Sequence, residues 1–362
     1  MLIAFGIFLF LMLVVVHEYG HFLVAKRNGV EVEEFGVGFP PKIFGKTMGK
    51  GIFRSYYTIN LLPLGGFVRL KGESSEDKRE GSFGASSLKA KAKIAYAGVA
   101  ANTVLAAILF TIVGLVRMPV IIDNQFSVPS DTKVLKDNVV VTFVGKDSPA
   151  EKAGLKNESI ILSVAGEKLD DAKDLQPITK KNAGNKVEVI YKTKDDSKQQ
   201  KTTIKLNEDN KKGQGYLGVA TQDQTEQRYT WSAPITGVVL TGQIFKETAV
   251  QLFNALSALF AGDTKTAGAG VGGPVLIVYL LSQVESATMI VFIMGTISVA
   301  LALFNALPLP ALDGGRIFVT LLFKLINKPL TEKTENLIHG SGFAVLLVLA
   351  ALITFGDITK IL

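Results

Sequence analysis

Long apolar runs without charge recur along the chain. Two of them, Ile94 to Val116 and Ala287 to Leu309, each contain 23 residues and no charged side chain. A helix of this length measures about 34 Å, which matches the hydrocarbon core of a bilayer. Two shorter runs, Leu2 to Val16 and Gly342 to Phe355, can span only if their helices extend into polar neighbours. The pattern therefore predicts about four transmembrane helices.

The sequence between these runs predicts a β region and a separate domain. Val32 to Leu70 is rich in Gly, Phe, Tyr and Pro, and Tyr57 to Leu61 alternates like a half-buried strand, which indicates short membrane-associated β-hairpins. The polar stretch from Gly72 to Gly84 predicts a mobile loop. Residues 122–226 predict a compact α+β domain of about 100 residues. Its strand-like runs are Val139 to Val144, Ile160 to Val164, Lys186 to Tyr191 and Thr202 to Leu206.

The part between this domain and the third span predicts surface helices. Thr230 to Phe260 mixes apolar residues with Gln, Lys and Glu, as amphipathic helices on the outer membrane face do. Gly268 to Leu281 is broken by Gly272-Gly273-Pro274 and predicts a membrane-associated segment instead of a span. We therefore divide the chain into residues 1–121, with two spans and the β region, the inserted domain 122–226, the surface helices 227–286, and two further spans in 287–362.

Composition agrees with a membrane protein. Hydrophobic residues make up 48% of the 362 residues, and the mean hydropathy is +0.32. The net charge of +7 is dispersed and has no aromatic-interleaved basic patch, so no nucleic-acid partner is predicted. The chain has no cysteine, which excludes disulfides, thiolate zinc sites and cysteine nucleophiles.

Basic residues predict the membrane orientation. The first apolar run has no basic residues before it and is followed by Lys26-Arg27, so we expect it to be retained as a span and not cleaved as a signal peptide. This pair and the cluster Lys89, Lys91 and Lys93 place the segment between the first two spans in the cytoplasm. The inserted domain then lies outside the cytoplasm, and Arg316 to Lys333 lies inside.

The first span carries the motif His17-Glu18-Tyr19-Gly20-His21. Histidines four positions apart share one helix face, so both imidazoles can reach one zinc ion. In His-Glu-x-x-His zinc peptidases the glutamate is the general base for metal-bound water. Ionisable groups at bilayer depth cost roughly 2.5 kcal/mol or more each, which favours a function over polar residues that merely end a helix.

A third metal ligand has to come from elsewhere. The remaining histidine, His339, precedes the last apolar run, so a carboxylate is the better candidate. Asp313 lies in Asn305-Ala-Leu-Pro-Leu-Pro-Ala-Leu-Asp-Gly-Gly-Arg316, where two prolines predict a broken helix and Asp-Gly-Gly a sharp turn. An ordinary helix end followed by a turn would have the same sequence pattern. The predicted topology nevertheless brings Asp313 to the cytoplasmic half of the membrane, where His17 and His21 lie.

The inserted domain resembles a PDZ domain. Asp147 to Leu155 followed by Ser159 to Gly166 resembles the middle of such a domain. Gly215-Tyr216-Leu217-Gly218 resembles the loop whose backbone N–H groups bind a peptide carboxylate, placed at the end as in circularly permuted PDZ domains. The alternative is a glycine-bearing final strand with no ligand.

The order of these motifs resembles the site-2 protease family, and most closely its bacterial RseP branch. The likeness includes Pro63 to Arg69 and the Gly272-Gly273-Pro274 element. It implies that His17, His21 and Asp313 bind Zn²⁺ and that Glu18 is the catalytic base. It also implies a bacterial inner-membrane endopeptidase, with its site towards the cytoplasm, for single-pass substrates such as anti-sigma factors or signal-peptide remnants. The β region, including Gly65, Gly66 and Phe67, would hold the unwound substrate as an added strand.

Two departures from the family pattern limit this transfer. The second span reads Gly98-Val-Ala-Ala-Asn102, without the proline that the family often has before its asparagine. Asn102 and Asn305 are candidates for substrate or oxyanion contacts, although a membrane asparagine can equally join two helices. The chain also has one PDZ-like module where the best-known members have two.

Two other functions remain open at this point. A membrane-anchored PDZ scaffold with a structural zinc site would not need Glu18. A metal transporter would place its ligands at mid-membrane and often in repeated halves, whereas no internal repeat is visible and the candidate ligands gather on one side.

Overall fold

The computed structural model describes residues 2–193, 198–210, 215–263, 272–284 and 286–361. The chain divides into two compact units. One comprises Met1–Gly114 and Trp231–Leu362, and the other comprises Leu115–Thr230. The four-part division drawn from the sequence stays a prediction, and the start of its Gly268 to Leu281 segment lies outside the described residues.

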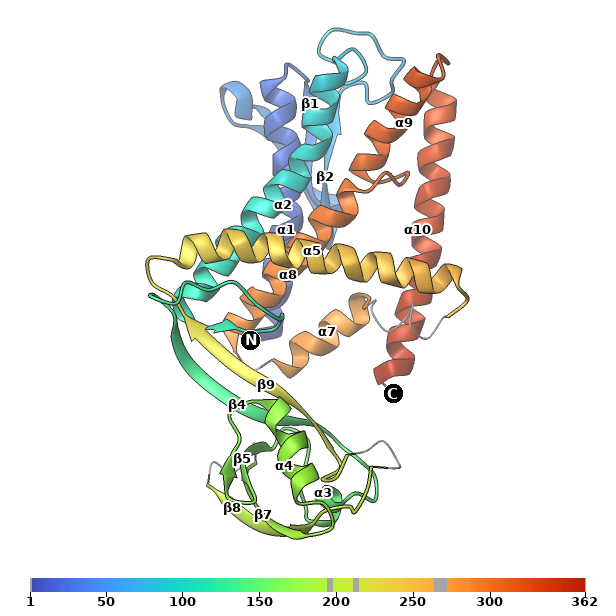
Figure 1. Ribbon diagram of the computed structural model, residues 1–362. Helices are drawn as coiled ribbons and strands as arrows, with labels where there is room; N and C mark the ends of the chain where they lie inside the picture. The colour runs from blue at the N-terminus through green and yellow to red at the C-terminus, as the bar shows by residue number, and fades with distance from the viewer. Residues whose placement is uncertain (1, 194–197, 211–214, 264–271, 285, 362) are drawn as a thin grey trace. The chain divides into compact units, whose positions relative to one another are not determined.

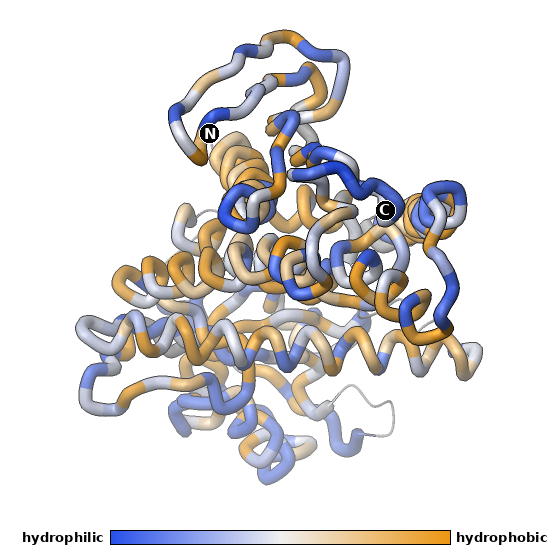
Figure 2. Tube along the Cα trace, turned by 90° about the horizontal axis from the view of Figure 1, so that it is seen from above, coloured by the Kyte–Doolittle hydropathy of each residue, from blue (hydrophilic) through white to orange (hydrophobic). Residues whose placement is uncertain are grey.

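Four helices of the first unit are long and apolar enough to cross a membrane, among the residues described. They are α1 (Leu2–Arg27), α2 (Leu88–Val116), α8 (Ala287–Ala306) and α10 (Glu332–Ile361) (Figure 1). Figure 2, a view from above, shows that hydrophobic residues (orange) are frequent along the helical parts of the chain. The predicted class, a polytopic helical membrane protein with about four spans, is therefore confirmed.

The third span ends before the end of its apolar run, at the break that the two prolines predict. The apolar run extends to Leu309, but α8 ends at Ala306 and Leu307 has an extended backbone with φ −66° and ψ 146°. The residue before a proline is disfavoured in the helical region, and Pro308 follows. Apolarity alone overestimates the helix because it does not register this steric constraint.

Among the residues described, three further helices belong to the same unit. The stretch predicted to hold several amphipathic helices forms one helix, α5 (Ala233–Phe260), which contacts α8. Its buried residues lie mainly in its first half, whereas Phe253 and Phe260 near its end are exposed. The helix α7 (Pro274–Gln283) has ten residues and is too short to span a bilayer. Helix α9 (Asp313–Leu325) follows α8.

The predicted β region forms a curled sheet from two long, irregular strands. Strands β1 (Val32–Met48) and β2 (Ser55–Leu70) are joined through a short 3₁₀ turn at Gly51–Phe53. Phe35 of β1 has Cα partners in both halves of β2, at Val68 and Tyr57. The first half of β1 therefore lies between the two halves of β2. Residues 66–70 form an outer segment of the sheet, which pairs with β1 on one side.

The second unit is an α+β domain built on one sheet. The strand order is β3-β9-β4-β5-β7-β8, with β6 beside β5. The strands are β3 (Met118–Pro119), β4 (Lys133–Val144), β5 (Ile160–Val164), β6 (Glu167–Lys168), β7 (Lys186–Lys192), β8 (Gln200–Lys205) and β9 (Val219–Arg228). The helices are α3 (Pro149–Lys152), the 3₁₀ turn Ala172–Asp174 and α4 (Leu175–Lys181).

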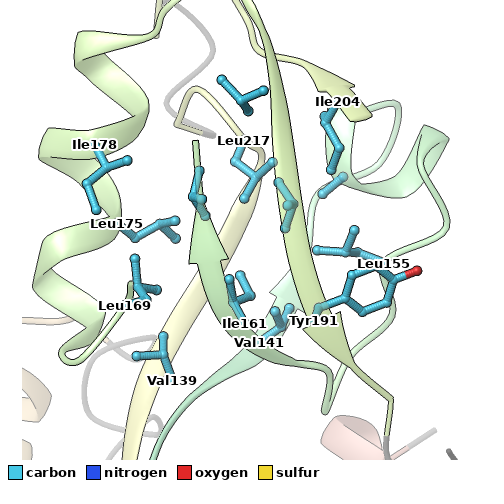
Figure 3. Close-up of a cluster of buried hydrophobic side chains, with 14 of the residues drawn as sticks. Val139, Val141, Leu155, Ile161, Leu169, Leu175, Ile178, Tyr191, Ile204 and Leu217 are labelled. Atoms are coloured by element: carbon cyan, nitrogen blue, oxygen red, sulfur yellow. The ribbon is translucent and has the colours of Figure 1, made fainter. Parts of the chain in front are cut away.

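The second unit has its own hydrophobic core. Val139 and Val141 of β4 pack with Ile161 of β5 and with Leu175 and Ile178 of α4, all buried (Figure 3). This core and the sheet agree with the predicted α+β class of the insert.

Helices α1 and α2 approach closely at a glycine. A Cβ on Gly20 would lie 2.6 Å from the carbonyl oxygen of Ala97 and 2.9 Å from the Cβ of Ala101. These atoms belong to a backbone and a short side chain that cannot rotate away. The contact therefore requires a residue without a side chain in α1.

We expect Gly20→Ala to destabilise the protein by about 1–3 kcal/mol, because the added methyl group forces α1 and α2 apart. Gly242→Ala in α5 is the matched control, since a Cβ there meets no atom within 4 Å. It should leave stability unchanged or raise it by up to about 1 kcal/mol. Thermal unfolding in detergent measures both, and equal midpoints for the two variants would contradict this account of the helix contact.

Candidate metal centre

Three side chains from two distant segments converge on one point. His17 and His21 lie one turn apart on α1, and Asp313 is the first residue of α9. Oδ2 of Asp313 lies 3.1 Å from Nε2 of each histidine, and the two Nε2 atoms are 3.2 Å apart. Ligands at 2.0–2.2 Å from a tetrahedral zinc ion are separated by about 3.3–3.6 Å. The donor set and its spacing therefore fit a zinc ion.

A backbone carbonyl sets the tautomer of His21. Nδ1 of His21 lies 2.7 Å from the carbonyl oxygen of Ile94 in α2. That oxygen can only accept, so Nδ1 carries the proton and a neutral ring leaves Nε2 unprotonated. A metal-binding histidine usually donates its other N–H in this way, which orients the ring.

His17 has a comparable neighbour in Asn102. The amide nitrogen of Asn102 lies 3.4 Å from Nδ1 of His17, and its buried amide oxygen has no hydrogen-bond partner among the described residues. The two ends of an amide are nearly equal in size, and half a turn would let the oxygen accept from Nδ1–H. Ser298 holds the backbone of Asn102 by donating its hydroxyl proton to the carbonyl oxygen at 2.9 Å.

The room for both imidazole rings comes from a glycine in α2. A Cβ on Gly98 would lie 2.5 Å from Cε1 of His17 and 2.5 Å from Nε2 of His21. Any side chain at this position would therefore occupy the place of the rings. The sequence predicted no such role for Gly98, which was noted only as the first residue of the motif that ends at Asn102.

Glu18 lies beside the three donors and next to the β region. It lines a cavity of about 470 Å³ together with His21, Asp313 and Phe67. A Cβ on Gly66 would lie 3.4 Å from Cγ of Glu18, so β2 passes directly over this side chain. Val68 of β2 lines the same cavity, and its backbone N–H faces the Glu18 carboxylate. The Glu18 carboxylate, two of the three donor residues (His21 and Asp313) and the outer segment of the sheet thus line one cavity.

A tight turn at residues 307–312 presents Asp313. Ala311 has a positive φ of 76°, which is strained for a residue with a side chain, and its N–H donates to Nδ1 of His339 at 3.0 Å. The expected sharp turn at Asp-Gly-Gly is wrong, because these residues form the first turn of α9. A side chain on Gly315 would overlap the carbonyl group of Leu309, so this glycine serves close packing.

The other predicted contact residues lie at different places. The amide of Asn305 donates to the carbonyl oxygen of Leu301 in its own helix at 3.0 Å. Asn305 does not line the cavity, whereas Phe67 does. Gly65 has a φ of 105° and packs against the ring of Phe39.

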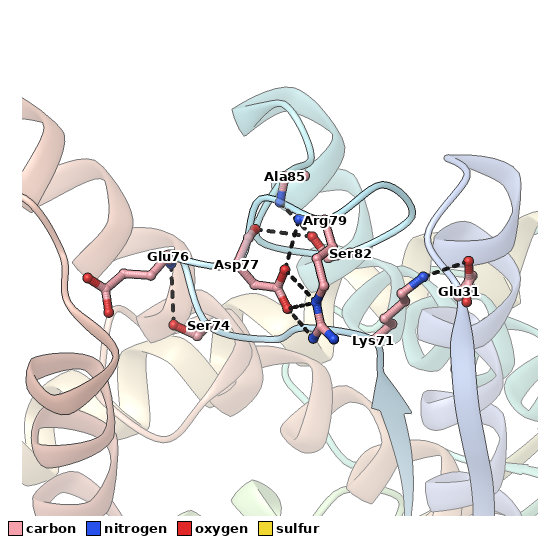
Figure 4. A network of polar contacts seen from close by, with 8 residues as sticks. All are labelled: Glu31, Lys71, Ser74, Glu76, Asp77, Arg79, Ser82 and Ala85. Carbon is pink, nitrogen blue, oxygen red and sulfur yellow. Dashed lines mark hydrogen bonds and ion pairs between the residues drawn. The ribbon is translucent and has the colours of Figure 1, made fainter.

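The 72–84 loop is tied down, in contrast to the mobile loop that its polarity predicts. Arg79 forms an ion pair with Asp77, which holds the pKa of that carboxyl at about 2 (Figure 4). Glu73 pairs with Arg316 of α9 at 2.9 Å, and the N–H of Ser75 donates to Glu335 of α10 at 2.9 Å. The loop therefore borders the cavity through Glu73 in a defined conformation.

The predicted carboxylate loop lines a separate cavity within the inserted unit. Gly215, Tyr216, Leu217 and Gly218 line a cavity of about 390 Å³, together with Leu175, Gln176 and Thr179 of α4. The carbonyl oxygens of Leu217 and Gly218 accept hydrogen bonds from the N–H groups of Ala150 and Gly145, so they point into the domain.

Comparison with known proteins places the chain among zinc peptidases. A protein of Clostridium perfringens that is named as a zinc metalloprotease is 33% identical over 99% of this chain and 98% of its own length. The zinc metalloprotease RasP of Shouchella clausii is 25% identical, with 99% of each chain covered. The protease Eep of Enterococcus faecalis is 26% identical over 99% of this chain and 98% of its own length.

A PDZ domain from an SdrC-like protein of Listeria monocytogenes is a solved structure similar to part of this chain. It is 27% identical, with a TM-score of 0.22, and the match covers 25% of this chain and 92% of that domain. The model of peptidase family M50 matches residues 5–349, nearly the whole chain. The protein is a multi-pass membrane zinc metallopeptidase and belongs to peptidase family M50, the site-2 protease family.

Proposed function

We propose that the protein is an intramembrane endopeptidase that uses one zinc ion to cleave transmembrane segments of single-pass membrane proteins. The observation that carries this proposal is the convergence of His17, His21 and Asp313 beside Glu18, at the end of an apolar helix. His17 and His21 would hold the ion through Nε2 and Asp313 through Oδ2. When bound, zinc supplies a Lewis acid and lowers the pKa of water towards neutrality.

Glu18 is the proposed general base. Its side chain lines the same cavity as His21 and Asp313, where it can take a proton from the attacking water and deliver it to the leaving amine. The N–H of Val68 lies near that carboxylate and would help to orient it. Asn102 is fully buried behind His17, which favours a role in orienting this ring over a direct contact with substrate.

The outer segment of the β region is the proposed substrate-binding element. A helical substrate has its carbonyl groups hydrogen-bonded internally, so it must unwind before its peptide bonds can be attacked. Residues 66–70 pair with β1 on one side, and an unwound segment could add to the other side beside Glu18. Gly66 and Phe67 would lie against it, and Gly65 would shape the bend before them.

Charge distribution supports an orientation in a bacterial inner membrane. Helix α1 ends in Lys26 and Arg27, next to the metal centre, and α9 carries Lys324 in its last turn. Positive residues remain in the cytoplasm, so the centre would face that side and the inserted domain the other. Anti-sigma factors and signal-peptide remnants are the proposed substrates, by analogy with the family.

Replacing Glu18 distinguishes a peptidase from the alternative of a membrane-anchored PDZ scaffold with a structural zinc site. We expect Glu18→Gln to lower the cleavage rate of a labelled single-span peptide in detergent by roughly 10²-fold or more and to leave zinc content unchanged, because the amide cannot take the proton. Tyr19→Phe, on the exposed neighbouring residue, is the control and should cleave normally. Undiminished cleavage by Glu18→Gln would contradict the proposed base. No cleavage by the unmodified, zinc-loaded protein would favour the scaffold.

Replacing Gly98 tests the metal site without removing a ligand. We expect Gly98→Ala to weaken zinc binding roughly tenfold or more, because the methyl group displaces both imidazole rings. Zinc content by elemental analysis and chelator competition measure this effect. Gly242→Ala serves again as the control, and normal zinc affinity in Gly98→Ala would show that the rings are not confined by this glycine.

We also propose that the inserted domain binds the C-terminus of a peptide. The cavity beside α4 is bordered by the Gly215 to Gly218 loop, whose Leu217 and Gly218 carbonyl groups are turned inward. The backbone N–H groups are therefore the part of this loop best placed for a carboxylate.

Peptide amidation tests this second role. In the Glu18→Gln background, we expect a peptide with a free C-terminus to bind at least about tenfold more tightly than its amidated form, because charge-assisted hydrogen bonds are lost on amidation. Gln176→Trp should fill the cavity and abolish the difference, whereas Lys180→Trp, on the same helix but outside the cavity, should preserve it. Fluorescence anisotropy measures binding, and equal affinity for both peptides would refute carboxylate recognition.

A further inference from the structure

We infer that His339 is a positioning residue for the metal centre and acts through the turn that presents Asp313. This inference rests on the proposed zinc site, and it assigns a task to the one histidine that does not belong to that site. His339 lies in α10, within a helix that otherwise serves as a membrane span.

The contact between His339 and the turn is a hydrogen bond to a strained residue. Ala311 has a φ of 76° and lies two positions before Asp313. Its N–H donates to Nδ1 of His339 at 3.0 Å, across 28 residues of sequence. Non-glycine residues persist in this conformation only where the surroundings hold them. The hydrogen bond to His339 therefore stabilises the backbone two residues before a proposed ligand.

A second contact from the same helix supports the turn. A Cβ on Gly342 would lie 2.5 Å from the Cβ of Pro310 and 2.7 Å from its carbonyl oxygen. Gly342 and His339 lie three residues apart, on one face of α10. The helix therefore holds Pro310 by close packing and Ala311 by a hydrogen bond.

The hydrogen bond also explains why the residue is a histidine. Because Nδ1 accepts, the ring is neutral and its proton resides on Nε2. That nitrogen is buried and has no hydrogen-bond partner among the described residues. A buried N–H without a partner is unfavourable, so neither the Nε2–H group nor apolar packing explains why this position is a histidine. The acceptor at Nδ1 is the feature that the structure uses.

The same helix reaches the 72–84 loop one turn earlier. Glu335 accepts from Ser75, while Arg316 of α9 pairs with Glu73 of that loop. Helix α10 thus contacts two segments that border the cavity, the 72–84 loop and the turn before Asp313. His339 is the residue that accepts a hydrogen bond from the turn. Loss of this contact should let Asp313 move relative to His17 and His21.

Two substitutions separate the acceptor from the ring. In His339→Asn the amide oxygen can take the place of Nδ1 and keep the hydrogen bond, whereas His339→Leu removes the acceptor and keeps similar bulk. We expect His339→Leu to weaken zinc binding roughly tenfold, in the range of other residues that orient metal ligands, and His339→Asn to stay within about threefold of the unmodified protein. Ser341→Ala, on the same helix, is the control.

Chelator competition on the full-length protein in detergent measures zinc affinity, and the visible spectrum of the cobalt-substituted protein reports the ligand geometry. Thermal midpoints of the metal-free proteins identify a variant that fails to fold. If His339→Leu fails to fold, the zinc affinity of His339→Asn relative to the unmodified protein tests the inference. Equal zinc affinity in His339→Leu, or a loss in a folded His339→Asn protein as large as in His339→Leu, would overturn the inference. Failure of the unmodified protein to bind zinc would instead refute the proposed function itself.

Discussion

The rest of the structure depends on the need to satisfy polar groups at membrane depth. Two histidines, a glutamate and an aspartate beside an apolar core are unfavourable unless each has a partner. The protein supplies such partners from separate segments: the Ile94 carbonyl group for His21 and Asn102 for His17, while the backbone of Val68 lies close to Glu18. The three remaining donor atoms face one another, and a cation would satisfy all of them at once.

This requirement explains the packing around the centre. The rings of His17 and His21 need space against α2, and Gly98 provides it, while Gly20 lets the two backbones approach in the same region. Close approach brings the Ile94 carbonyl group within reach of His21. Small residues are used in this way between membrane helices, where no hydrophobic driving force favours their association. The glycines are therefore part of the metal centre, although none of them supplies a ligand.

The sequence predicted those features that follow from local rules. The four-residue spacing of His17 and His21 placed both rings on one helix face, and the absence of cysteine together with topology pointed to Asp313. The convergence of these residues was thus predictable, but their partners were not. Ile94, Gly98 and His339 act through contacts between distant segments, and no periodicity or motif marks such contacts. The prolines correctly predicted the break after α8, but Asp313-Gly314-Gly315 begin α9 and do not form a turn, because the glycines there serve close packing, which the sequence does not mark.

Irregular backbone is the remaining difficulty for a centre in this environment. The turn at residues 307–312 exposes the N–H of Ala311, and α10 satisfies it with Nδ1 of His339. The outer segment of β2 raises the same problem in a different form, because residues 66–70 pair with β1 on one side, and on this segment a side chain, Glu73, accepts from the N–H of Leu70 at 2.9 Å. An unpaired strand edge near a membrane is costly, and an unwound substrate is a partner that can satisfy it. Pairing of an unwound substrate with those backbone groups of the edge that lack a partner would offset part of the cost of unwinding its helix. The proposed placement of Glu18 beneath this edge would then direct the chemistry to the segment that pairs with it.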